Sequence, residues 1–343
     1  MADALRPARR TVLRALAASP LLLLGTAPLA KAQSTSGLGS VDLAAGSFGR
    51  GDLDTASATD WMRRLPDATS LAALSLPGTH DTMAHNSSIP TLTQEFDLAT
   101  QLRSGVRVLD IRTRHFRDVF PIHHGLEYLH ANFTDVVRIV TAFLRTNPSE
   151  TVLMRLKKEH TEEENTRSYE ATLNWYIHDN PDTRDLLSEH LWAPPAGYDG
   201  RIPGLGETRG KLVVLQDFTA TAAYGPRWGG VDMDVQDYFE LSGLAAIATK
   251  WDKAHTQFER AAVGDPRTLF VNHLSATGES PAVMATGTVP ITVAKGAPGV
   301  VGMLARAEDY LRITGTGRTG VVMADFPTAA LVQAIVARNS QKE

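Results

Sequence analysis

Short apolar runs alternate with longer amphipathic segments along the chain from about residue 60 onward. The short runs are rich in Val, Leu and Ile, and they predict buried strands at 71–76, 106–111, 151–156, 211–215, 268–271 and 320–324. The longer segments carry apolar residues at helical spacing and predict helices, the later ones at about 168–178, 246–262, 299–313 and 328–338. This alternation is typical of βα units around a parallel sheet.

The most regular helical pattern places apolar residues from Val136 to Leu144 on one face. Thr134 is its predicted N-cap, and Asn147-Pro148 marks its end because proline does not continue a helix. Residues 216–245 differ from the rest, since glycine, proline and polar residues stand there with little periodicity. We expect a long loop or irregular strands in that segment.

The first 32 residues have the pattern of an export signal. Arginines precede a mildly apolar stretch, which ends in the small-x-small cleavage pattern Ala30-Lys31-Ala32. The pair Arg9-Arg10 resembles the twin-arginine motif, so we expect the protein to be secreted by that route. Residues 33–59 are rich in Ser, Gly and Ala and predict a flexible lead-in. Residues 60–340 then form the single folded domain.

The 343 residues include 34 Lys+Arg and 38 Asp+Glu, which gives a formal net charge of −4. This balance excludes a protein that is held to nucleic acid by bulk positive charge. The absence of cysteine excludes a disulfide framework, a thiolate zinc site and a cysteine nucleophile. Chemistry must therefore come from His, Asp, Glu, Lys, Arg, Ser or Thr.

A polar or ionisable residue follows each predicted strand. These residues are His80 with Asp81, Arg112, Lys157, Gln216 with Asp217, Asn272 with His273, and Asp325. In a parallel βα barrel the carboxyl ends of the strands meet at one mouth, where the active site is built. Polar residues also end ordinary strands, so the chemistry of the group counts for more than any single member.

Two histidines, His80 and His124, together with Arg112 and Lys157, suit the cleavage of a phosphodiester by a hydroxyl of the same molecule. A neutral imidazole takes the proton of the attacking hydroxyl, an imidazolium protonates the leaving oxygen, and the cations stabilise the phosphoryl oxygens. Composition alone slightly favours a different interpretation. In that case His80 is a turn or N-cap residue and His124 is a buried histidine hydrogen-bonded to the backbone.

Four motifs follow one another along the chain. They are Pro-Gly-Thr-His-Asp-Thr at 77–82, Thr-Gln-Glu-Phe-Asp at 93–97 leading to Asp110-Ile111-Arg112, His123-His124-Gly125, and Asn-Pro-Ser-Glu-Thr at 147–151 followed by Lys157-Lys158-Glu159. With them, residues 60–335 resemble the X domain of bacterial phosphatidylinositol-specific phospholipases C. The resemblance implies an α/β fold, a distorted and incompletely closed (β/α)8 TIM-like barrel in a single domain.

The resemblance also implies the reaction and its acid–base residues. The inositol 2-hydroxyl attacks phosphorus, which converts phosphatidylinositol to diacylglycerol and inositol 1,2-cyclic phosphate without a metal or cofactor. His80 matches the general base, and Asp325 matches the carboxylate that orients it. His124 matches the general acid and Asp81 its supporting carboxylate, whereas His123 is structural.

The remaining matches concern the headgroup. Arg112 matches the phosphate-binding arginine, and Asp110 lies beside it because residues i and i+2 of a strand share a face. Lys157 matches a lysine that contacts the headgroup, and Asp237 matches a carboxylate that binds inositol hydroxyls.

Two positions depart from the family pattern. Asp217 stands where well-known bacterial members carry an inositol-binding arginine, and Phe239 replaces a tyrosine that stacks under the inositol ring. Asp217 should repel ring phosphates. We therefore expect unphosphorylated inositol lipid to be preferred over its phosphorylated derivatives.

Two other functions remain open. A metal-dependent glycerophosphodiester phosphodiesterase, also a βα barrel, would need Glu-x-Asp after the second strand, where this chain has Asp110-Ile111-Arg112 and the arginine would repel the ion. A non-catalytic lipid- or sugar-binding module on the same barrel is favoured only by Asp217 and Phe239. The substitution His80→Ala distinguishes an enzyme from a binding module. In an enzyme it should abolish turnover and leave binding largely intact.

The expected partner is a membrane surface that contains phosphatidylinositol, and we expect a monomer that binds no nucleic acid. Apolar residues in two loops near the mouth are candidates either for membrane contact or for packing of the barrel rim. They are Met83, Ile89, Leu92, Tyr224 and Trp228. The charged residues Lys158-Glu159 and 162–164 predict solvated surface.

Overall fold

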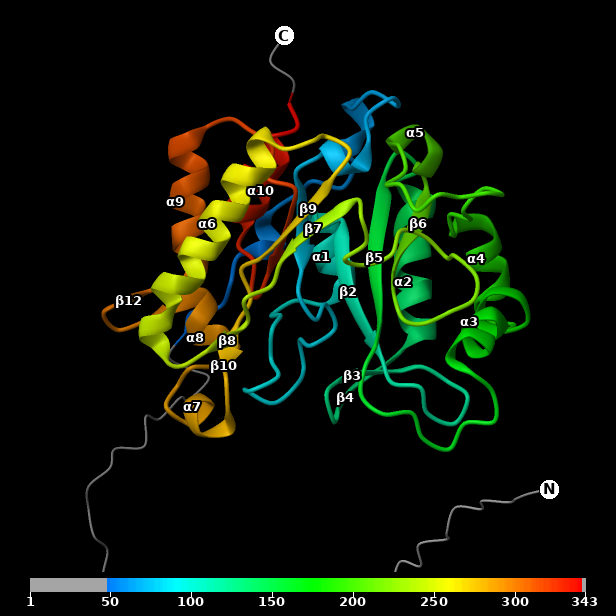
Figure 1. The fold of residues 1–343 in the computed structure, drawn as a ribbon, viewed down its shortest axis with the longest axis horizontal. Coiled ribbons are helices and arrows are strands. Elements are labelled where there is room, and N and C mark those ends of the chain that lie inside the picture. Colours follow the sequence, from blue (N-terminus) through cyan, green and yellow to red (C-terminus); the bar gives the residue numbers. More distant parts are fainter. Residues whose placement is uncertain (1–47, 341–343) are drawn as a thin grey trace, which may run out of the picture. The chain divides into compact units, whose positions relative to one another are not determined.

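A curled sheet of parallel strands forms the centre of the structure, a computed structural model that describes residues 48–340 (Figure 1). The parallel strands follow one another in the order β6, β5, β2, β1, β13, β9 and β7. Their bounds are β1 Leu76–Thr79, β2 Val108–Thr113, β5 Thr151–Lys158, β6 Lys211–Asp217, β7 Met233–Gln236, β9 Leu269–His273 and β13 Val321–Ala324. Within residues 48–340 no ladder joins the end strands β6 and β7, so the barrel is open between them.

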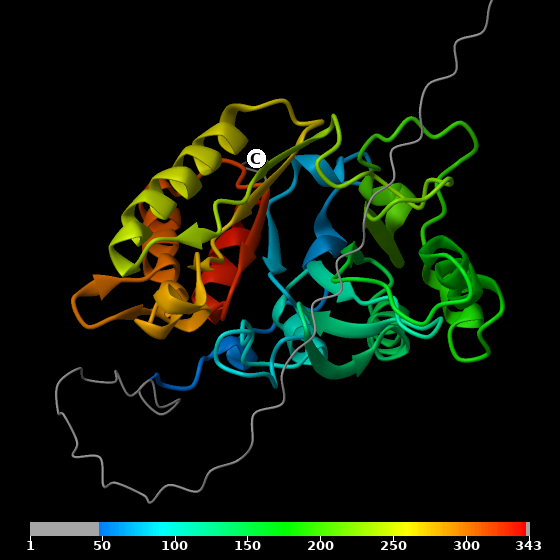
Figure 2. The same cartoon turned by 60° about the horizontal axis from the view of Figure 1, so that its bottom comes forward.

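Helices cover the outside of this sheet, as Figures 1 and 2 both show. They are α1 Leu98–Ser104, α2 Phe133–Thr146, α3 Tyr169–His178, α4 Arg184–His190, α5 Leu205–Thr208, α6 Ile247–Val263, α7 Pro281–Ala285, α8 Pro290–Lys295, α9 Met303–Thr314 and α10 Ala329–Ala337. All six residues of β2 are buried, as expected for a parallel strand that is covered on both faces. The distorted, incompletely closed βα barrel is thus confirmed, with seven parallel strands paired in the described part of the chain.

The mouth of the barrel carries short elements that the hydrophobic pattern did not predict. The antiparallel hairpin of β3 Pro121–His124 and β4 Glu127–Asn132 pairs with the carboxyl end of β2. The other short strands are β8 Glu240–Leu241, β10 Thr277–Gly278, β11 Gly296–Ala297 and β12 Val300–Val301. The β3–β4 hairpin, α7 and β10 follow the carboxyl ends of strands and lie at the bottom of Figure 1, which is therefore the mouth.

Two predicted elements begin later in the structure than the sequence indicated. The strand predicted at 71–76 starts only at Leu76, because Leu71–Ala73 forms a 3-10 turn in which the Ser70 hydroxyl accepts a hydrogen bond from the Ala72 amide. The helix predicted from 299 starts at Met303, after the β11–β12 hairpin. Between the end of β6 at Asp217 and a 3-10 helix that starts at Leu244, the chain contains only the short strands β7 and β8, as expected.

The N-cap of α2 also differs from the prediction. Asn132, not Thr134, caps this helix, and Asp135 completes the capping box by accepting a hydrogen bond from the Asn132 amide. A capping box needs a capping side chain three residues before an acidic residue, and Asn132 and Asp135 have this spacing. The N-cap therefore lies two residues earlier than the predicted Thr134.

Part of the predicted lead-in that the structure describes is anchored on the barrel. Leu53 is buried in the core, and its carbonyl accepts a hydrogen bond from the Ser104 hydroxyl at 2.7 Å. The Asp52 carboxylate accepts a hydrogen bond from the Ala329 amide at the start of α10 at 2.9 Å. The folded domain therefore includes residues before Asp60.

The predicted export signal at 1–32 lies outside the described residues. No helix between residues 48 and 340 is long and apolar enough to cross a bilayer.

Candidate active site

A pocket of about 180 Å³ opens at the mouth of the barrel. Four of the residues predicted from strand ends line it, although they are up to 245 positions apart in the sequence: His80, Arg112, Lys157 and Asp325. The charged and aromatic lining residues are His80, Arg112, His124, Arg155, Lys157, Asp237, Phe239 and Asp325. Asp81 and Asp110 lie buried directly behind this lining, where they contact His124 and Arg112.

His80 follows β1 and is held from both sides. Its Nδ1 lies 2.8 Å from Asp325 Oδ1, at the end of the neighbouring strand β13. Its Nε2 lies 2.6 Å from Arg112 Nη2. Because an arginine always donates, Nε2 accepts and the imidazole carries its proton on Nδ1, toward Asp325.

Burial lowers the pKa of His80 well below the usual 6.5, and the positive charge of Arg112 lowers it further. Burial also raises the pKa of Asp325, and the nearby Asp81 adds to that effect. The pair therefore shares one proton and His80 is neutral near pH 7. A neutral imidazole whose basic nitrogen is Nε2 has the form that a general base requires. In this structure Arg112 Nη2 donates to Nε2, so the substrate hydroxyl must displace that contact to be deprotonated there.

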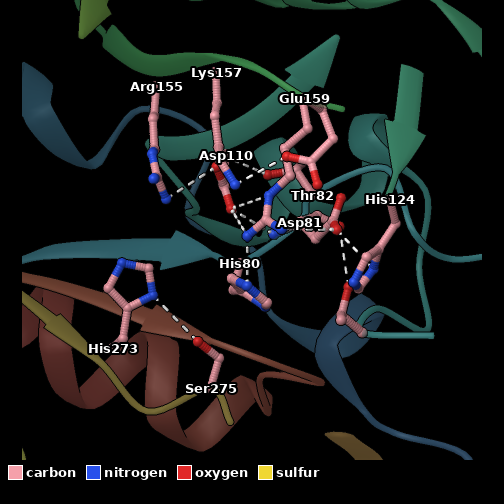
Figure 3. Close-up of polar contacts among 12 residues, drawn as sticks. His80, Asp81, Thr82, Asp110, His124, Arg155, Lys157, Glu159, His273 and Ser275 are labelled. Atoms are coloured by element: carbon pink, nitrogen blue, oxygen red, sulfur yellow. Dashed lines mark hydrogen bonds and ion pairs between the residues drawn. The ribbon is translucent and has the colours of Figure 1, made fainter. Parts of the chain in front are cut away.

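His124 ends β3 and is the opposite case. Its Nδ1 lies 2.8 Å from Asp81 Oδ2 (Figure 3). Burial opposes protonation, but the hydrogen bond and the charge of Asp81 outweigh it and raise the pKa of His124 above 6.5. The imidazolium has the form that a general acid requires. The two histidines thus have pKa values that are displaced in opposite directions, a pattern that marks acid–base pairs.

Asp81 adopts an unusual backbone conformation to reach His124. Its φ is 41°, in the left-handed region that residues other than glycine rarely adopt. Its amide donates to Asp110 Oδ2 at 3.1 Å, which helps to hold the turn. Strain of this kind persists where the surroundings impose it and is frequent at active sites.

Arg112 lies between the two histidine–carboxylate pairs. Its Nε and Nη2 donate to Asp110 Oδ2 at 3.0 and 2.8 Å, and its Nη1 lies 3.5 Å from Asp81 Oδ2. Burial acts to raise the pKa of Asp110, but the guanidinium groups of Arg112 and Arg155 hold that pKa well below its usual range. Arg112 is accordingly a fixed cation at the pocket wall, as the sequence predicted from Asp110-x-Arg112.

Lys157 supplies a second cation from the end of β5. Its Nζ lies 2.9 Å from Glu159 Oε2, and Glu159 Oε1 accepts a hydrogen bond from the Gly125 amide at 3.1 Å. Glu159 is mostly buried, so the prediction that it is solvated surface is wrong. The reason is that β3–β4 folds over it next to His124, a contact that the local charge pattern did not reveal. Glu163 and Glu164 pair with arginines on the surface.

Asp217, like Asp110, is a predicted headgroup residue that does not line the pocket. Its Oδ2 lies 2.9 Å from Arg155 Nε and 2.7 Å from Arg155 Nη2. Arg155 itself lines the pocket and was missed by the sequence reasoning. It stands two residues before Lys157 on β5, so the period of a strand placed both side chains on one face and could have identified it.

Two further groups near the site were not among the predicted site residues. His273 is buried at the end of β9, its ring centroid is 5.8 Å from that of His80, and burial lowers its pKa to about 4. Lys250 of α6 is buried, and this burial lowers its pKa to about 7 despite the charges of Asp237 and Asp325. His273 could have been proposed from the sequence because it ends a predicted strand. Lys250 could not, because nothing in the sequence distinguishes it from a surface lysine on a helix.

The donor groups around Arg112 bear on the metal-dependent alternative. Within residues 48–340 no three His, Asp or Glu side chains are grouped as metal ligands. Asp110 and Asp81 direct their oxygens toward Arg112 and His124, and a guanidinium between two carboxylates occupies the place that a cation would need.

An acid–base pair with fixed cations at the mouth of an open βα barrel defines a phosphodiester-cleaving type of site. The sequence profile of the phosphatidylinositol-specific phospholipase C X domain matches residues 74–216. A 1-phosphatidylinositol phosphodiesterase of Listeria monocytogenes is 33% identical over 232 residues, which cover 63% of this chain and 68% of that protein. The enzyme of the same name from Staphylococcus aureus is 30% identical over 194 residues, covering 54% of this chain and 60% of that protein. The chain belongs to the phosphatidylinositol-specific phospholipase C X-domain family.

Solved structures agree in fold. The phosphatidylinositol-specific phospholipase C from Listeria monocytogenes superposes with a TM-score of 0.66 at 28% identity, covering 83% of this chain and 99% of that one. A variant of the Staphylococcus aureus enzyme superposes with a TM-score of 0.68 at 22% identity, covering 84% of this chain and 100% of that one.

Proposed function

We propose that this enzyme cleaves phosphatidylinositol to diacylglycerol and inositol 1,2-cyclic phosphate. The observation that carries the proposal is the pair of histidines at one pocket whose pKa values are displaced in opposite directions, His80 downward and His124 upward. Family membership and the curated relatives named 1-phosphatidylinositol phosphodiesterase support the substrate.

The reaction follows from the protonation states. His80 Nε2 takes the proton of the inositol 2-hydroxyl while that oxygen forms a bond to phosphorus. The bond from phosphorus to the diacylglycerol oxygen breaks, and the His124 imidazolium gives its proton to that leaving oxygen. Arg112 and Lys157 stabilise the negative charge that the phosphoryl oxygens carry in the transition state. A slower second step reverses the two roles, with water opening the cyclic ester to inositol 1-phosphate.

Asp325 and Asp81 serve the two imidazoles rather than the substrate. Asp325 holds the proton of His80 on Nδ1, so that Nε2 is the basic nitrogen. Asp81 keeps His124 protonated. Asp237 and Phe239 line the pocket on the side of β7 and β8, where they can meet the inositol ring.

The substitution His80→Ala separates an enzyme from a binding module on the same barrel. We expect turnover of phosphatidylinositol to fall by about 10²–10⁴-fold or more, because a general base contributes about that much. Binding to phosphatidylinositol vesicles should stay close to that of the wild type. Equal activity of the variant, or loss of binding with an unchanged fold, would contradict the assignment of His80.

We further propose that the rim of the mouth contacts the membrane. Exposed apolar side chains stand next to pocket residues in three segments: Ile89 beside Pro90, Leu126 two residues after His124, and Phe239 itself. The most exposed of them is Leu126, at 75%. Membrane binding is also the subject of structures of the Staphylococcus aureus enzyme.

Of the residues that the sequence suggested for this contact, only Ile89 is exposed. Met83 and Tyr224 are buried in the core, Leu92 packs against the core, and Trp228 packs beside Arg155. Packing within the protein, rather than membrane contact, therefore accounts for Met83, Leu92, Tyr224 and Trp228. The rim contact falls instead on Ile89, Leu126 and Phe239.

We also propose that residues 1–32 direct export of the protein. The proposal is supported by Arg9-Arg10 and the cleavage pattern that ends at Ala32. Replacing both arginines with lysine should retain the protein in the cell. Unchanged export of that variant would contradict the twin-arginine route.

A further inference from the structure

Arg155 is a buried arginine at the pocket that no predicted role explains. It stands on β5 directly opposite Asp110 of β2 and two residues before Lys157. Its side chain is 9% exposed and lines the pocket beside Lys157 (Figure 3). A guanidinium is rarely buried to this extent without a specific arrangement of partners.

Two neighbours fix the orientation of this guanidinium. Asp217 Oδ2 accepts from Nε at 2.9 Å and lies 2.7 Å from Nη2. The indole ring of Trp228 lies under the guanidinium, with 4.3 Å from Cζ to the ring centroid. A carboxylate on one edge and an aromatic ring on one face leave a planar group little freedom.

The third guanidinium nitrogen, Nη1, has N–H groups without a good hydrogen-bond acceptor. Nη1 lies 3.5 Å from Asp110 Oδ1, too far for a good hydrogen bond. Within residues 48–340, Asp110 Oδ1 is buried and has no hydrogen-bond partner. Arg155 Nη1 therefore retains N–H groups without a good acceptor, while the charge of the guanidinium is balanced mainly by Asp217 and also by Asp110.

We propose that Arg155 binds hydroxyl groups of the inositol ring through Nη1, and that Asp217 and Trp228 are positioning residues for it. The inference rests on the proposed function, because it concerns the headgroup of the same substrate. A guanidinium that is neutralised by a carboxylate favours a neutral polyol, whose hydroxyl oxygens accept hydrogen bonds, over an additional phosphate. Asp217 thus acts through Arg155 and not by direct contact with the ring.

This arrangement gives a physical basis for a preference for unphosphorylated inositol lipid. While Asp217 is present, the pair carries no net charge and a ring phosphate gains little from it. The substitution Asp217→Asn removes the nearer counter-charge of Arg155 and leaves only Asp110, which Arg112 already engages. The turnover of phosphatidylinositol 4-phosphate relative to phosphatidylinositol, at matched surface density, should then rise several-fold.

The direct test uses the soluble substrate inositol 1,2-cyclic phosphate, which removes the membrane from the measurement. Arg155→Met keeps the packing against Trp228 but removes every donor. We expect its KM to rise about tenfold or more, the usual effect of losing a hydrogen bond from a charged group, while kcat changes much less. Binding of myo-inositol, followed by ligand-observed NMR, should weaken by a similar factor.

Variants of Asp217 and of an unrelated exposed ion pair show whether the change in KM is specific to the Arg155–Asp217 pair. Asp217→Asn should raise KM by a smaller factor, and the double variant Arg155→Met/Asp217→Asn should have the KM of Arg155→Met alone, because Asp217 acts only through Arg155. The matched control is the exposed pair Arg138–Asp182, 2.8 Å apart, whose variants Arg138→Met and Asp182→Asn should leave KM unchanged.

The outcomes separate this inference from the proposed function. An active wild type whose KM and myo-inositol affinity are unchanged by Arg155→Met overturns the role of Arg155. If Arg155→Met does not fold, an unchanged lipid preference of Asp217→Asn overturns it equally. A wild-type protein that binds myo-inositol but cleaves neither substrate contradicts the proposed function, while the affinity measurement still decides the role of Arg155.

Discussion

Two chemically identical side chains acquire opposite roles here because their neighbours differ. Burial and Arg112 disfavour the charged form of His80, whereas Asp81 outweighs burial at His124 and favours its charged form. The productive state needs a neutral His80 and a protonated His124. It therefore predominates between the lowered pKa of His80 and the raised pKa of His124.

The rate of cyclic phosphate formation should accordingly be bell-shaped in pH, with its acidic limb below pH 6.5 and its alkaline limb above it. In Asp81→Asn the effect that raises the pKa of His124 is lost and burial remains. The alkaline limb should then move to lower pH, and the maximal rate should fall. Initial rates on phosphatidylinositol vesicles between about pH 4 and 9 measure both limbs.

The control for this shift is Asp97→Asn, which removes a carboxylate from the N-terminus of α1 and keeps a capping side chain. Both limbs should stay in place in this variant. An alkaline limb that does not move in Asp81→Asn would contradict the assignment of His124 as the acid.

At the scale of elements, the far ends of β2 and β5 are joined by a buried ion pair. Arg107 and Glu150 are both 0% exposed, and Arg107 Nη2 lies 2.8 Å from Glu150 Oε2. Glu150 belongs to a motif shared with the family, yet it lies at the opposite end of the strands from the pocket. Its role is therefore structural.

Glu150→Ala should lower the free energy of unfolding by about 3–5 kcal/mol, because it leaves the Arg107 guanidinium buried without its carboxylate. Asp182→Ala breaks an exposed pair and should cost less than about 1 kcal/mol. Urea unfolding measures both. The specific activity of the folded Glu150→Ala protein should match the wild type, and a loss of kcat there would place Glu150 in the active site after all.

Element by element, prediction from the sequence succeeded where local pattern and tertiary environment agree. Strands such as β6 and β9 contain continuous apolar runs that end in polar residues, so their place and direction could be predicted. The β3–β4 hairpin could not be predicted, because its two strands contain few apolar residues. It is held in place by pairing with the end of β2. The burial of Glu159 was missed for a related reason, since its hydrogen-bond donor comes from the hairpin. Arg155, by contrast, shares the face of β5 that carries Lys157 and could have been identified from the strand period.

At the scale of the whole molecule, the open mouth places the pocket beside exposed apolar side chains. Replacing Leu126 and Ile89 with serine should weaken binding to phosphatidylinositol vesicles about 100-fold or more, since each buried apolar side chain contributes about 1.5–3 kcal/mol. Hydrolysis of inositol 1,2-cyclic phosphate should be unchanged. Vesicle sedimentation and the soluble assay measure the two effects.

The matched control is Val263→Ser, which removes an apolar side chain that is 88% exposed at the end of α6 that precedes β9, away from the mouth. It should leave vesicle binding intact. Equal losses for the rim variant and for Val263→Ser, or parallel loss of soluble activity in the rim variant, would contradict membrane contact through the mouth.

The central claim is that two histidines and a fixed arginine transfer the phosphoryl group to the inositol 2-hydroxyl. Phosphorus NMR of phosphatidylinositol vesicles with the protein, first in chelator and then with added calcium, tests it most directly. We expect the signal of a five-membered cyclic phosphate to appear in chelator and to precede that of inositol 1-phosphate. Activity that requires the added metal, or inositol 1-phosphate that forms without the cyclic signal, would contradict it.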